Sequence, residues 1–286
     1  MFWAPLFDNL LPATLFVSFS IYLRLGHIGV DLHMLFETLA YVAGFQLYRR
    51  LRHSFGDPIS LDNRWWIIAT AAVGTALGSK ILGCVEQAPE IVHEWRNPAY
   101  LISGKSIVGG LVGGWIAVEW IKRRLGVTVS TGDLFAIPLA LGIAIGRVGC
   151  FLAGLPDQTY GIATTLPWGV DFGDGVLRHP TQLYETAFLL AFSLALWMFV
   201  RQPHRNGDVF KLFMAGYMGW RLLVDFLKPE FRVLGLSIIQ WTCLMVLVYC
   251  WRETARTLRQ STTGCETNLK SWRSAGGMSG TSSLER

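Results

Sequence analysis

The stretch Gly146-Arg147-Val148-Gly149-Cys150-Phe151-Leu152-Ala153-Gly154 closes a run of apolar residues that begins near Leu134. It places a permanently charged guanidinium at the end of a segment with the composition of a membrane-spanning helix. A charge at this depth is costly unless an anionic group meets it. Glycines on both sides of Arg147 allow a partner to approach the backbone closely. The stretch therefore predicts an anion site inside a membrane protein.

The composition of the whole chain agrees with a membrane location. Of its 286 residues, 52% are hydrophobic and only 16% are charged, which is far more apolar than an ordinary soluble domain. The 12 Trp and 17 Phe residues belong to the types that gather at bilayer interfaces. The cysteines are Cys84, Cys150, Cys243, Cys250 and Cys265. They have no paired metal-ligand spacing, so they predict neither a disulfide framework nor a zinc site.

Several apolar stretches reach the length of about 20 residues that a helix needs to cross a bilayer. They cover residues 33–49, 65–85, 105–121, 133–153, 181–200, 208–227 and 237–251. Arg and Lys cluster after the first, third, fifth and seventh stretches, whereas the other connections carry fewer basic residues and several acids. Because basic connections stay in the cytoplasm, the N-terminus is expected outside and the C-terminus inside. We predict an all-α integral membrane protein with about seven transmembrane helices.

The two ends of the chain differ from the predicted spans. Residues 1–32 lack the basic n-region and cleavage site of a signal peptide. The alternating segment 17–25, followed by Gly26-His27-Ile28-Gly29, favours a short hairpin on the outer leaflet, with a partial span as the alternative. Residues 257–286, rich in Ser, Thr and Gly, are typical of a disordered cytoplasmic tail. We therefore expect an extracytoplasmic arm over 1–32, a transmembrane domain over 33–256 and a tail over 257–286.

Ionisable side chains within the predicted spans are candidates for function, since they are rare in membranes. His33 and Glu37 are four residues apart and share a helix face. They fit an interfacial His with a Glu facing neighbouring helices, or a functional Glu37. Arg221 and Asp225 have the same spacing. They form either a local ion pair or an arrangement that directs Arg221 at the cavity of Arg147, where two forked donors suit a phosphate.

Two helix entrances add further candidates. The third span begins Gly104-Lys105-Ser106-Ile107-Val108-Gly109-Gly110, where paired glycines favour close contact with another helix or with a lipid. Lys105 lies beside exposed helix N–H groups, which favour an anion. The connection 154–180 has the length of a functional lid and ends in Arg178-His179-Pro180-Thr181-Gln182-Leu183-Tyr184-Glu185. This segment has more polar side chains than are needed to cap a helix, so we expect a functional role for it.

The sequence resembles the prolipoprotein diacylglyceryl transferase family. The resemblance rests on the segments 104–110, 146–151 and 178–185, followed by an Arg in the sixth span, and it covers about residues 30 to 250. It implies an enzyme of the bacterial inner membrane, with its active site towards the outer leaflet. Such an enzyme takes the diacylglyceryl group of phosphatidylglycerol, attaches it to the lipobox cysteine of a preprolipoprotein and releases glycerol phosphate. It uses no metal or soluble cofactor, and no nucleic acid is expected as a partner.

The resemblance also implies roles for individual residues. Arg147 and Arg221 match the family's essential arginines, so we expect them to clamp the departing phosphate. For the base that accepts the proton of the thiol, the available groups are His179 and Glu37. The further residues expected at the substrate are Lys105, Gly109, Gly110, Gly149, Gly154, Arg178, Gln182, Tyr184, Glu185, Asp225 and Gln240.

The chain departs from the family at several neutral polar positions. Val108 stands where the family has a His that is often proposed as the thiol-activating base, and Cys150 and Ala153 replace asparagines. Leu155 replaces a Glu, and Glu37 falls at the position of a Tyr. Two alternatives therefore stand beside lipoprotein modification. One is a related membrane transferase that uses an anionic phospholipid and a different acceptor, and the other is a non-catalytic lipid-binding or transport protein.

Overall fold

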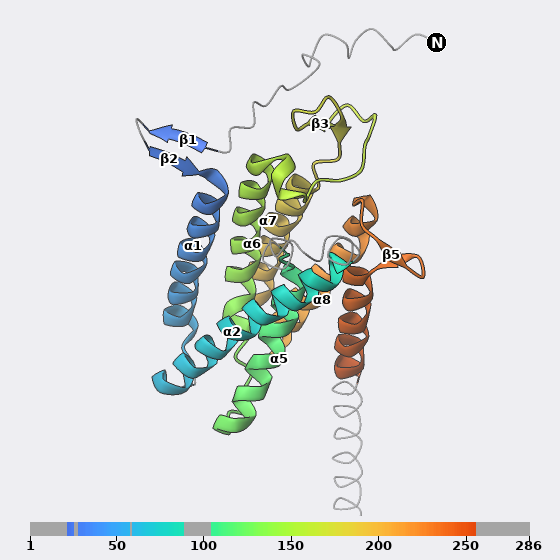
Figure 1. Cartoon of the computed structure of the whole chain (residues 1–286). Helices are drawn as coiled ribbons and strands as arrows, with labels where there is room; N and C mark the ends of the chain where they lie inside the picture. The colour runs from blue at the N-terminus through green and yellow to red at the C-terminus, as the bar shows by residue number, and fades with distance from the viewer. Residues whose placement is uncertain (1–21, 26–27, 58, 89–103, 256–286) are drawn as a thin grey trace, which may run out of the picture.

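The helices of the structure follow the apolar stretches of the sequence. The computed structural model describes residues 22–25, 28–57, 59–88 and 104–255. Each predicted span overlaps one helix (Figure 1), and these helices are α1 (Leu32–Phe55), α2 (Leu61–Glu86), α5 (Ile107–Leu125), α6 (Asp133–Ala153), α7 (Thr181–Val200), α8 (Asp208–Val224) and a last helix over 238–255. The predicted tail and most of the predicted arm lie outside the described residues.

Side-chain caps and glycines set several helix ends. Asp31 accepts a hydrogen bond of 2.8 Å from the backbone N–H of His33 at the start of α1, and Ser106 caps α5 in the same way. Gly126 ends α5 with a φ of 67°, a conformation that costs little only without a Cβ. Local sequence therefore fixes where α1 and α5 begin, next to the predicted site residues His33 and Lys105.

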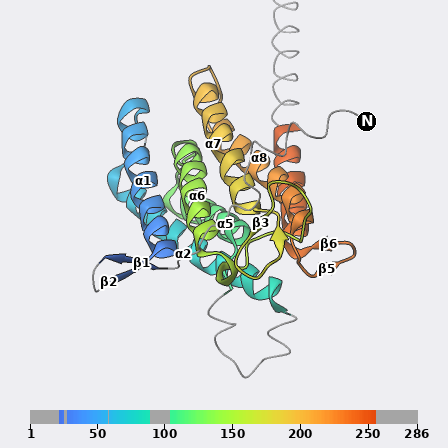
Figure 2. The ribbon, with the colours of Figure 1, turned by 90° about the horizontal axis from the view of Figure 1, so that it is seen from above.

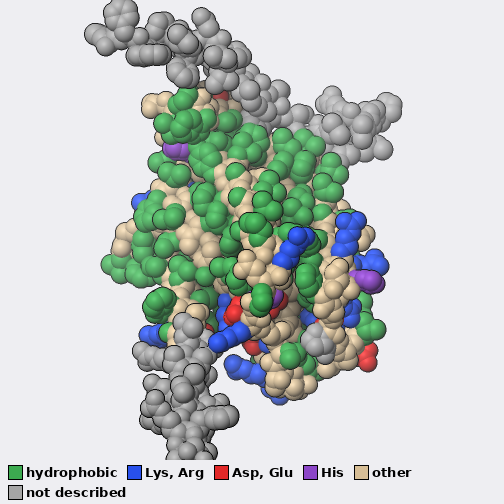
Figure 3. Space-filling model, turned by 180° about the vertical axis from the view of Figure 1, so that it is seen from behind, with side chains coloured by type: hydrophobic (Ala, Val, Ile, Leu, Met, Phe, Trp, Pro, Cys, Tyr) green, Lys and Arg blue, Asp and Glu red, His purple; other side chains and the backbone are tan. Residues whose placement is uncertain are grey.

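Among the described residues, three helices have the length and hydropathy needed to cross a membrane: α2, α6 and α7. Helix α8 covers only 17 residues, whereas α5 is interrupted at its end by Lys122, Arg123 and Arg124. Large apolar side chains such as Ile116, Leu194 and Val73 are exposed on these helices. Figure 3 shows hydrophobic side chains over most of one face of the molecule. These features fit a helical membrane protein.

Helix α6 is the centre of the bundle. It packs against α1 and α7 and also touches α8, while α2 packs against α5 (Figures 1 and 2). The α2–α5 contact depends on glycine: a Cβ on Gly109 would lie 2.4 Å from the carbonyl oxygen of Gly78, and one on Gly113 would lie 2.4 Å from that of Gly74. The apolar core gathers around α8, where Phe213 and Tyr217 are fully buried.

The strands in the described part of the chain form three small antiparallel hairpins. They pair β1 (Tyr22–Leu25) with β2 (Ile28–Asp31), β3 (Val170–Asp171) with β4 (Leu177–Arg178), and β5 (Arg232–Val233) with β6 (Leu236–Ser237). Leu234 and Gly235 both have positive φ values, 54° and 84°, which is typical of a two-residue hairpin turn. Two short 3-10 helices, η1 (Leu155–Asp157) and η2 (Asp225–Leu227), directly follow α6 and α8. These two turns lead the chain from the ends of α6 and α8 into the site described below.

Candidate functional site

A cavity of about 1150 Å³ lies between α1 and α6 on one side and α2, the start of α5 and the last helix on the other. This is larger than the roughly 300–1,000 Å³ of most small-molecule pockets. One part of its wall is apolar and includes Phe45, Tyr48, Ile68, Phe135, Leu139 and Ile143. Another part is charged and includes Lys105, Arg147, Asp157, Arg221, Lys228 and Glu230. The cavity therefore suits a large amphipathic molecule with an anionic group.

Two buried arginines share one carboxylate oxygen at this cavity. Oε2 of Glu185 lies 3.0 Å from Nε of Arg147 and 3.2 Å from Nη1 of Arg221. Tyr217 donates its hydroxyl proton to Oε1 of Glu185 at 2.7 Å. The four groups come from α6, α7 and α8. Since both arginines also line the cavity, α6 and α8 bring together the two cations that the sequence predicted to act as a pair.

Asp225 holds Arg221 from the other side. Nη2 of Arg221 lies 3.1 Å from Oδ1 of Asp225, and the hydroxyl of Ser237 donates to Oδ2 of the same carboxylate. Gln240 accepts a hydrogen bond of 2.9 Å from the backbone N–H of Ser237 and donates one of 3.0 Å to the carbonyl of Leu222. Asp225 and Gln240 do not line the cavity. They fix the position of Arg221 and the start of the last helix.

A lysine and a glutamate extend the charged wall beyond α8. Nζ of Lys228 lies 3.7 Å from Oε1 of Glu230, and both side chains line the cavity. Burial, opposed by the nearby charge of Lys228, raises the pKa of Glu230 to about 8. Burial also lowers the pKa of Lys228. The pair was not predicted, because residues 228–236 were expected only to connect two spans.

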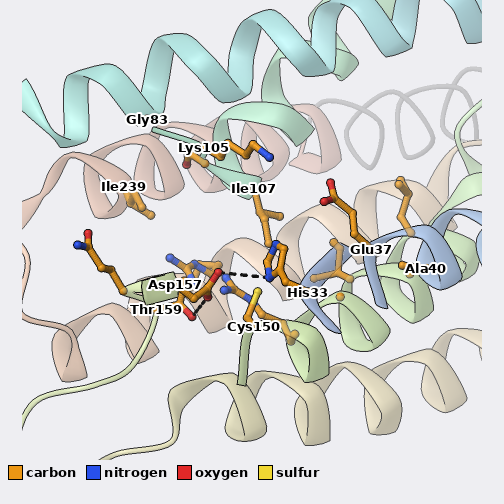
Figure 4. Close-up of a pocket in the computed structure, with 18 of the residues that line it drawn as sticks. His33, Glu37, Ala40, Gly83, Lys105, Ile107, Cys150, Asp157, Thr159 and Ile239 are labelled. Atoms are coloured by element: carbon orange, nitrogen blue, oxygen red, sulfur yellow. Dashed lines mark hydrogen bonds and ion pairs between the residues drawn. The ribbon is translucent and has the colours of Figure 1, made fainter. Parts of the chain in front are cut away.

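Glu37 and Lys105 line the cavity away from the shared carboxylate. Glu37 accepts a hydrogen bond of 3.4 Å from the hydroxyl of Tyr41, one turn along α1. Lys105 stands just before α5, and it forms no ion pair with any residue in the described part of the chain. Both side chains line the cavity, and Figure 4 shows them on different walls, Glu37 on α1 and Lys105 just before α5.

The segment Arg178 to Glu185 divides into a surface part and a buried part. Arg178 forms a pair of 2.6 Å with Asp174. Nδ1 of His179 lies 3.2 Å from the hydroxyl of Tyr184, which also accepts a hydrogen bond of 2.8 Å from Trp168. Arg178, His179 and Tyr184 do not line the cavity. The contacts of His179 and Tyr184 brace the connection 154–180, whereas Glu185, the next residue after Tyr184 on α7, reaches the arginines.

The remaining predicted positions support the walls of the site. Gln182 is buried, and neither amide atom has a hydrogen-bond partner in the part of the chain that the structure describes. Gly149 contacts α1, and Gly154 ends α6 with a φ of 69°. Gly109 and Gly110 lie against α2 and do not line the cavity. Their close contacts fit the helix-packing alternative better than contact with a lipid.

Three titratable side chains meet at the end of α6. A ring nitrogen of His33, Sγ of Cys150 and a carboxylate oxygen of Asp157 all lie within 4.8 Å of one another. Nδ1 of His33 is 3.5 Å from Oδ1 of Asp157, as Figure 4 shows. Histidine, cysteine and aspartate are also the ligand types that a zinc ion accepts. His33 and Cys150 were identifiable from the sequence, whereas Asp157 was not, because its place depends on the turn η1 after α6.

Comparison with known proteins supports the family resemblance that the sequence motifs indicate. The family model described as prolipoprotein diacylglyceryl transferase matches residues 20–252. The phosphatidylglycerol–prolipoprotein diacylglyceryl transferase of Bordetella avium (strain 197N) is 31% identical over 242 residues, covering 78% of this chain and 88% of that protein. The protein of the same name from Geobacter sulfurreducens (strain ATCC 51573 / DSM 12127 / PCA) is 32% identical over 224 residues, covering 76% of this chain and 84% of that protein.

Proposed function

Because the chain belongs to the prolipoprotein diacylglyceryl transferase family, we propose that it transfers the diacylglyceryl group of phosphatidylglycerol to a preprolipoprotein. The acceptor is the thiol of the lipobox cysteine, and the product that leaves is glycerol phosphate. The chain is accordingly a transferase of lipoprotein biosynthesis, and phosphatidylglycerol and the preprolipoprotein are its substrates.

The observation that carries this proposal is that Arg147 and Arg221 both belong to the charged part of the wall of a cavity whose other part is apolar. In the reaction the thiol sulfur forms a bond to the glycerol carbon, and the bond from that carbon to the phosphate oxygen breaks. The electron pair stays on the phosphate. Two preorganised guanidinium groups in a site of low polarity stabilise that developing charge, while the apolar wall accommodates the acyl chains.

Glu185 sets how far the two arginines are neutralised before substrate binds. Its single carboxylate lies between two guanidinium groups, and with Asp225 on the other side of Arg221 the four buried side chains carry no net charge. Nε of Arg147 faces Glu185, and among the described residues the terminal nitrogens of Arg147 have no hydrogen bond. These donors are the ones we assign to the phosphate of the donor lipid, with Arg221 positioned by Asp225.

We also propose the membrane arrangement that the sequence predicts: about seven spans, with an outer N-terminus and a cytoplasmic C-terminus. The proposal is supported by the basic residues at the ends of α1 and α5 that lie away from the cavity's charged end, which include Arg52 and the cluster Lys122 to Arg124. In this arrangement the arm 1–32 and the connection 154–180 lie outside the bacterial inner membrane, and the tail 257–286 lies in the cytoplasm. The arginine pair then faces the outer leaflet.

Complementation tests the function directly. The chain is expressed in a bacterium depleted of its own transferase, and lipid attachment to a reporter prolipoprotein is followed together with release of glycerol phosphate from labelled phosphatidylglycerol. We expect the wild-type chain to restore both. Arg147→Ala and Arg221→Ala should each lower transfer by about 100- to 1,000-fold, while both proteins stay in the membrane. Full activity in both variants would overturn the assignment of the arginines.

A second candidate function is transfer to a different acceptor. It is favoured by Val108, which stands at the position of the family's histidine and is buried in the apolar core with 1% exposure. The same experiment separates the two: release of glycerol phosphate without lipid on the reporter would support the second candidate. Absence of both products would leave only a lipid-binding role.

A further inference from the structure

We propose that His33, oriented by Asp157, is the base that removes the proton from the acceptor thiol. This inference rests on the transferase function proposed above and names a catalytic residue for it. It arises because the chain needs a proton acceptor at the cavity, and Val108 offers none. Of the histidines in the described part of the chain, His33 is the one that lines the cavity.

The geometry places the imidazole beside its carboxylate. Nδ1 of His33 lies 3.5 Å from Oδ1 of Asp157, a separation of the kind that tightens when a substrate completes the site. Nδ1 is buried, whereas the side chain as a whole is 33% exposed and lines the cavity, so other atoms of the ring are accessible. A ring that directs Nδ1–H at a carboxylate leaves Nε2 as the atom that accepts a proton.

Both partners are held in place by the fold. Asp157 accepts a hydrogen bond from the hydroxyl of Thr159, and the carbonyl of Thr159 accepts one of 2.7 Å from Thr181 at the start of α7. His33 lies in the first turn of α1, where Asp31 caps its backbone N–H. The fold therefore sets the backbone position of His33 and the orientation of the Asp157 carboxylate, so the two groups face each other without substrate.

The groups around His33 favour a base rather than a nucleophile on the enzyme. Cys150 of α6 faces the pair, Arg147 stands one turn earlier on the same helix, and Glu37 follows on α1. If Cys150 attacked the donor lipid, it would form a thioether, which has no leaving group for a second transfer. The thiol that must react is therefore that of the acceptor, and Cys150 serves as a neighbour of the base.

The proposed step balances as follows. The acceptor S–H gives its proton to Nε2 of His33, and the carboxylate of Asp157 stabilises the imidazolium that forms. The sulfur bonds to the glycerol carbon while the carbon–oxygen bond to the phosphate breaks. Glycerol phosphate leaves with the electron pair at Arg147 and Arg221, and His33 then returns its proton to solvent or to the leaving phosphate.

The test compares transfer rates of His33→Gln with wild type at about pH 7 and about pH 9.5. We expect kcat at pH 7 to fall by about 100- to 10,000-fold, the range for loss of a general base. The deficit should shrink by at least about tenfold at pH 9.5, because a thiol with a pKa of about 8.5 ionises without help there. An equal deficit at both pH values, or wild-type activity, would overturn the proposal.

Controls separate this proposal from its premises. His53→Gln changes an exposed histidine at the far end of the same helix, and it should behave as wild type at both pH values. If His33→Gln does not accumulate in the membrane, Asp157→Asn carries the same test through its own pH-dependent deficit. An inactive wild-type chain would refute the transferase function instead.

Loss of wild-type activity on chelation with EDTA, restored by Zn²⁺, would mean that the cluster of His33, Cys150 and Asp157 binds metal and would overturn the role of His33 as base.

Discussion

Nε of Arg147 and Oε2 of Glu185 are 3.0 Å apart in a buried ion pair that joins α6 to α7. The same oxygen lies 3.2 Å from Arg221 on α8, so one carboxylate ties three helices together. This arrangement gives Glu185 two functions at once. It keeps two guanidinium groups from repelling each other, and it aligns both of them at the wall of the cavity.

Glu185→Gln should therefore destabilise the protein strongly. The amide keeps the shape of the side chain but removes the negative charge between two buried cations, and breaking a buried pair in this way costs about 3–5 kcal/mol. Chemical unfolding in detergent measures the change. Lys211→Gln is the control, since Lys211 pairs with Asp208 at 3.9 Å and the two side chains are 35% and 36% exposed, and a pair that is open to solvent contributes at most about 1 kcal/mol. Equal losses in the two variants would contradict the central position of Glu185.

Arg147→Lys tests whether the shape of the guanidinium matters in addition to its charge. A lysine keeps the positive charge but cannot contact Glu185 and a phosphate through a planar fork of donors. We expect transfer to fall by about 100-fold, close to the loss for Arg147→Ala, with the protein still in the membrane. Arg201→Lys, at an exposed site after α7, should leave the rate unchanged. A Lys variant with full activity would reduce the role of Arg147 to a point charge.

Much of the helical framework could be predicted from the sequence. Long apolar runs define the helices because each must bury or expose a continuous apolar surface. The two arginines were identifiable for a related reason: a charge in such a run needs a specific partner. The spacing of Arg221 and Asp225 further predicted that they meet on one helix face, and their distance of 3.1 Å confirms it.

Contacts between distant segments could not be predicted in the same way. Glu185 was expected at the substrate, but its position between Arg147 and Arg221 depends on how α6, α7 and α8 pack. The pairing of His33 with Asp157 depends on the turn η1, and no periodic pattern of apolar residues in the sequence predicts that turn. The glycine contacts of α2 and α5 were weighed against a lipid site, and only the close distance of 2.4 Å between a Cβ on Gly109 and the oxygen of Gly78 distinguishes them.

Glu230 should make stability depend on pH near neutrality. Burial raises its pKa to about 8, whereas an unfolded chain would have a value of about 4.3. The folded state thus holds this proton more tightly, so the stabilisation is complete below about pH 4 and is lost as the pH rises through about 8. In Glu230→Gln, the unfolding temperature in detergent should fall less than in wild type between about pH 6 and 8.5. Parallel curves for the two proteins would contradict a buried, neutral Glu230.

Gly149→Ala should disturb the site by moving α1 away from α6. A Cβ at this position would lie 2.7 Å from Cβ of Phe36 and 3.5 Å from the carbonyl oxygen of His33. Since neither atom is the end of a flexible side chain, the helices must separate, at a cost of about 1–3 kcal/mol. The same movement takes His33 away from Asp157, so we expect slower transfer, measured as kcat in detergent with labelled phosphatidylglycerol.

Gly146→Ala, one turn earlier on α6, gives the matched comparison for stability. No atom lies within 4 Å of a Cβ at Gly146, so the substitution should stabilise the helix by up to about 1 kcal/mol. If Gly149→Ala acts through the position of His33, its deficit in kcat should shrink at high pH, as the deficit of His33→Gln is expected to do. A deficit of the same size at about pH 7 and about pH 9.5 would instead place the damage at the arginines, because ionising the acceptor thiol cannot replace a lost phosphate clamp.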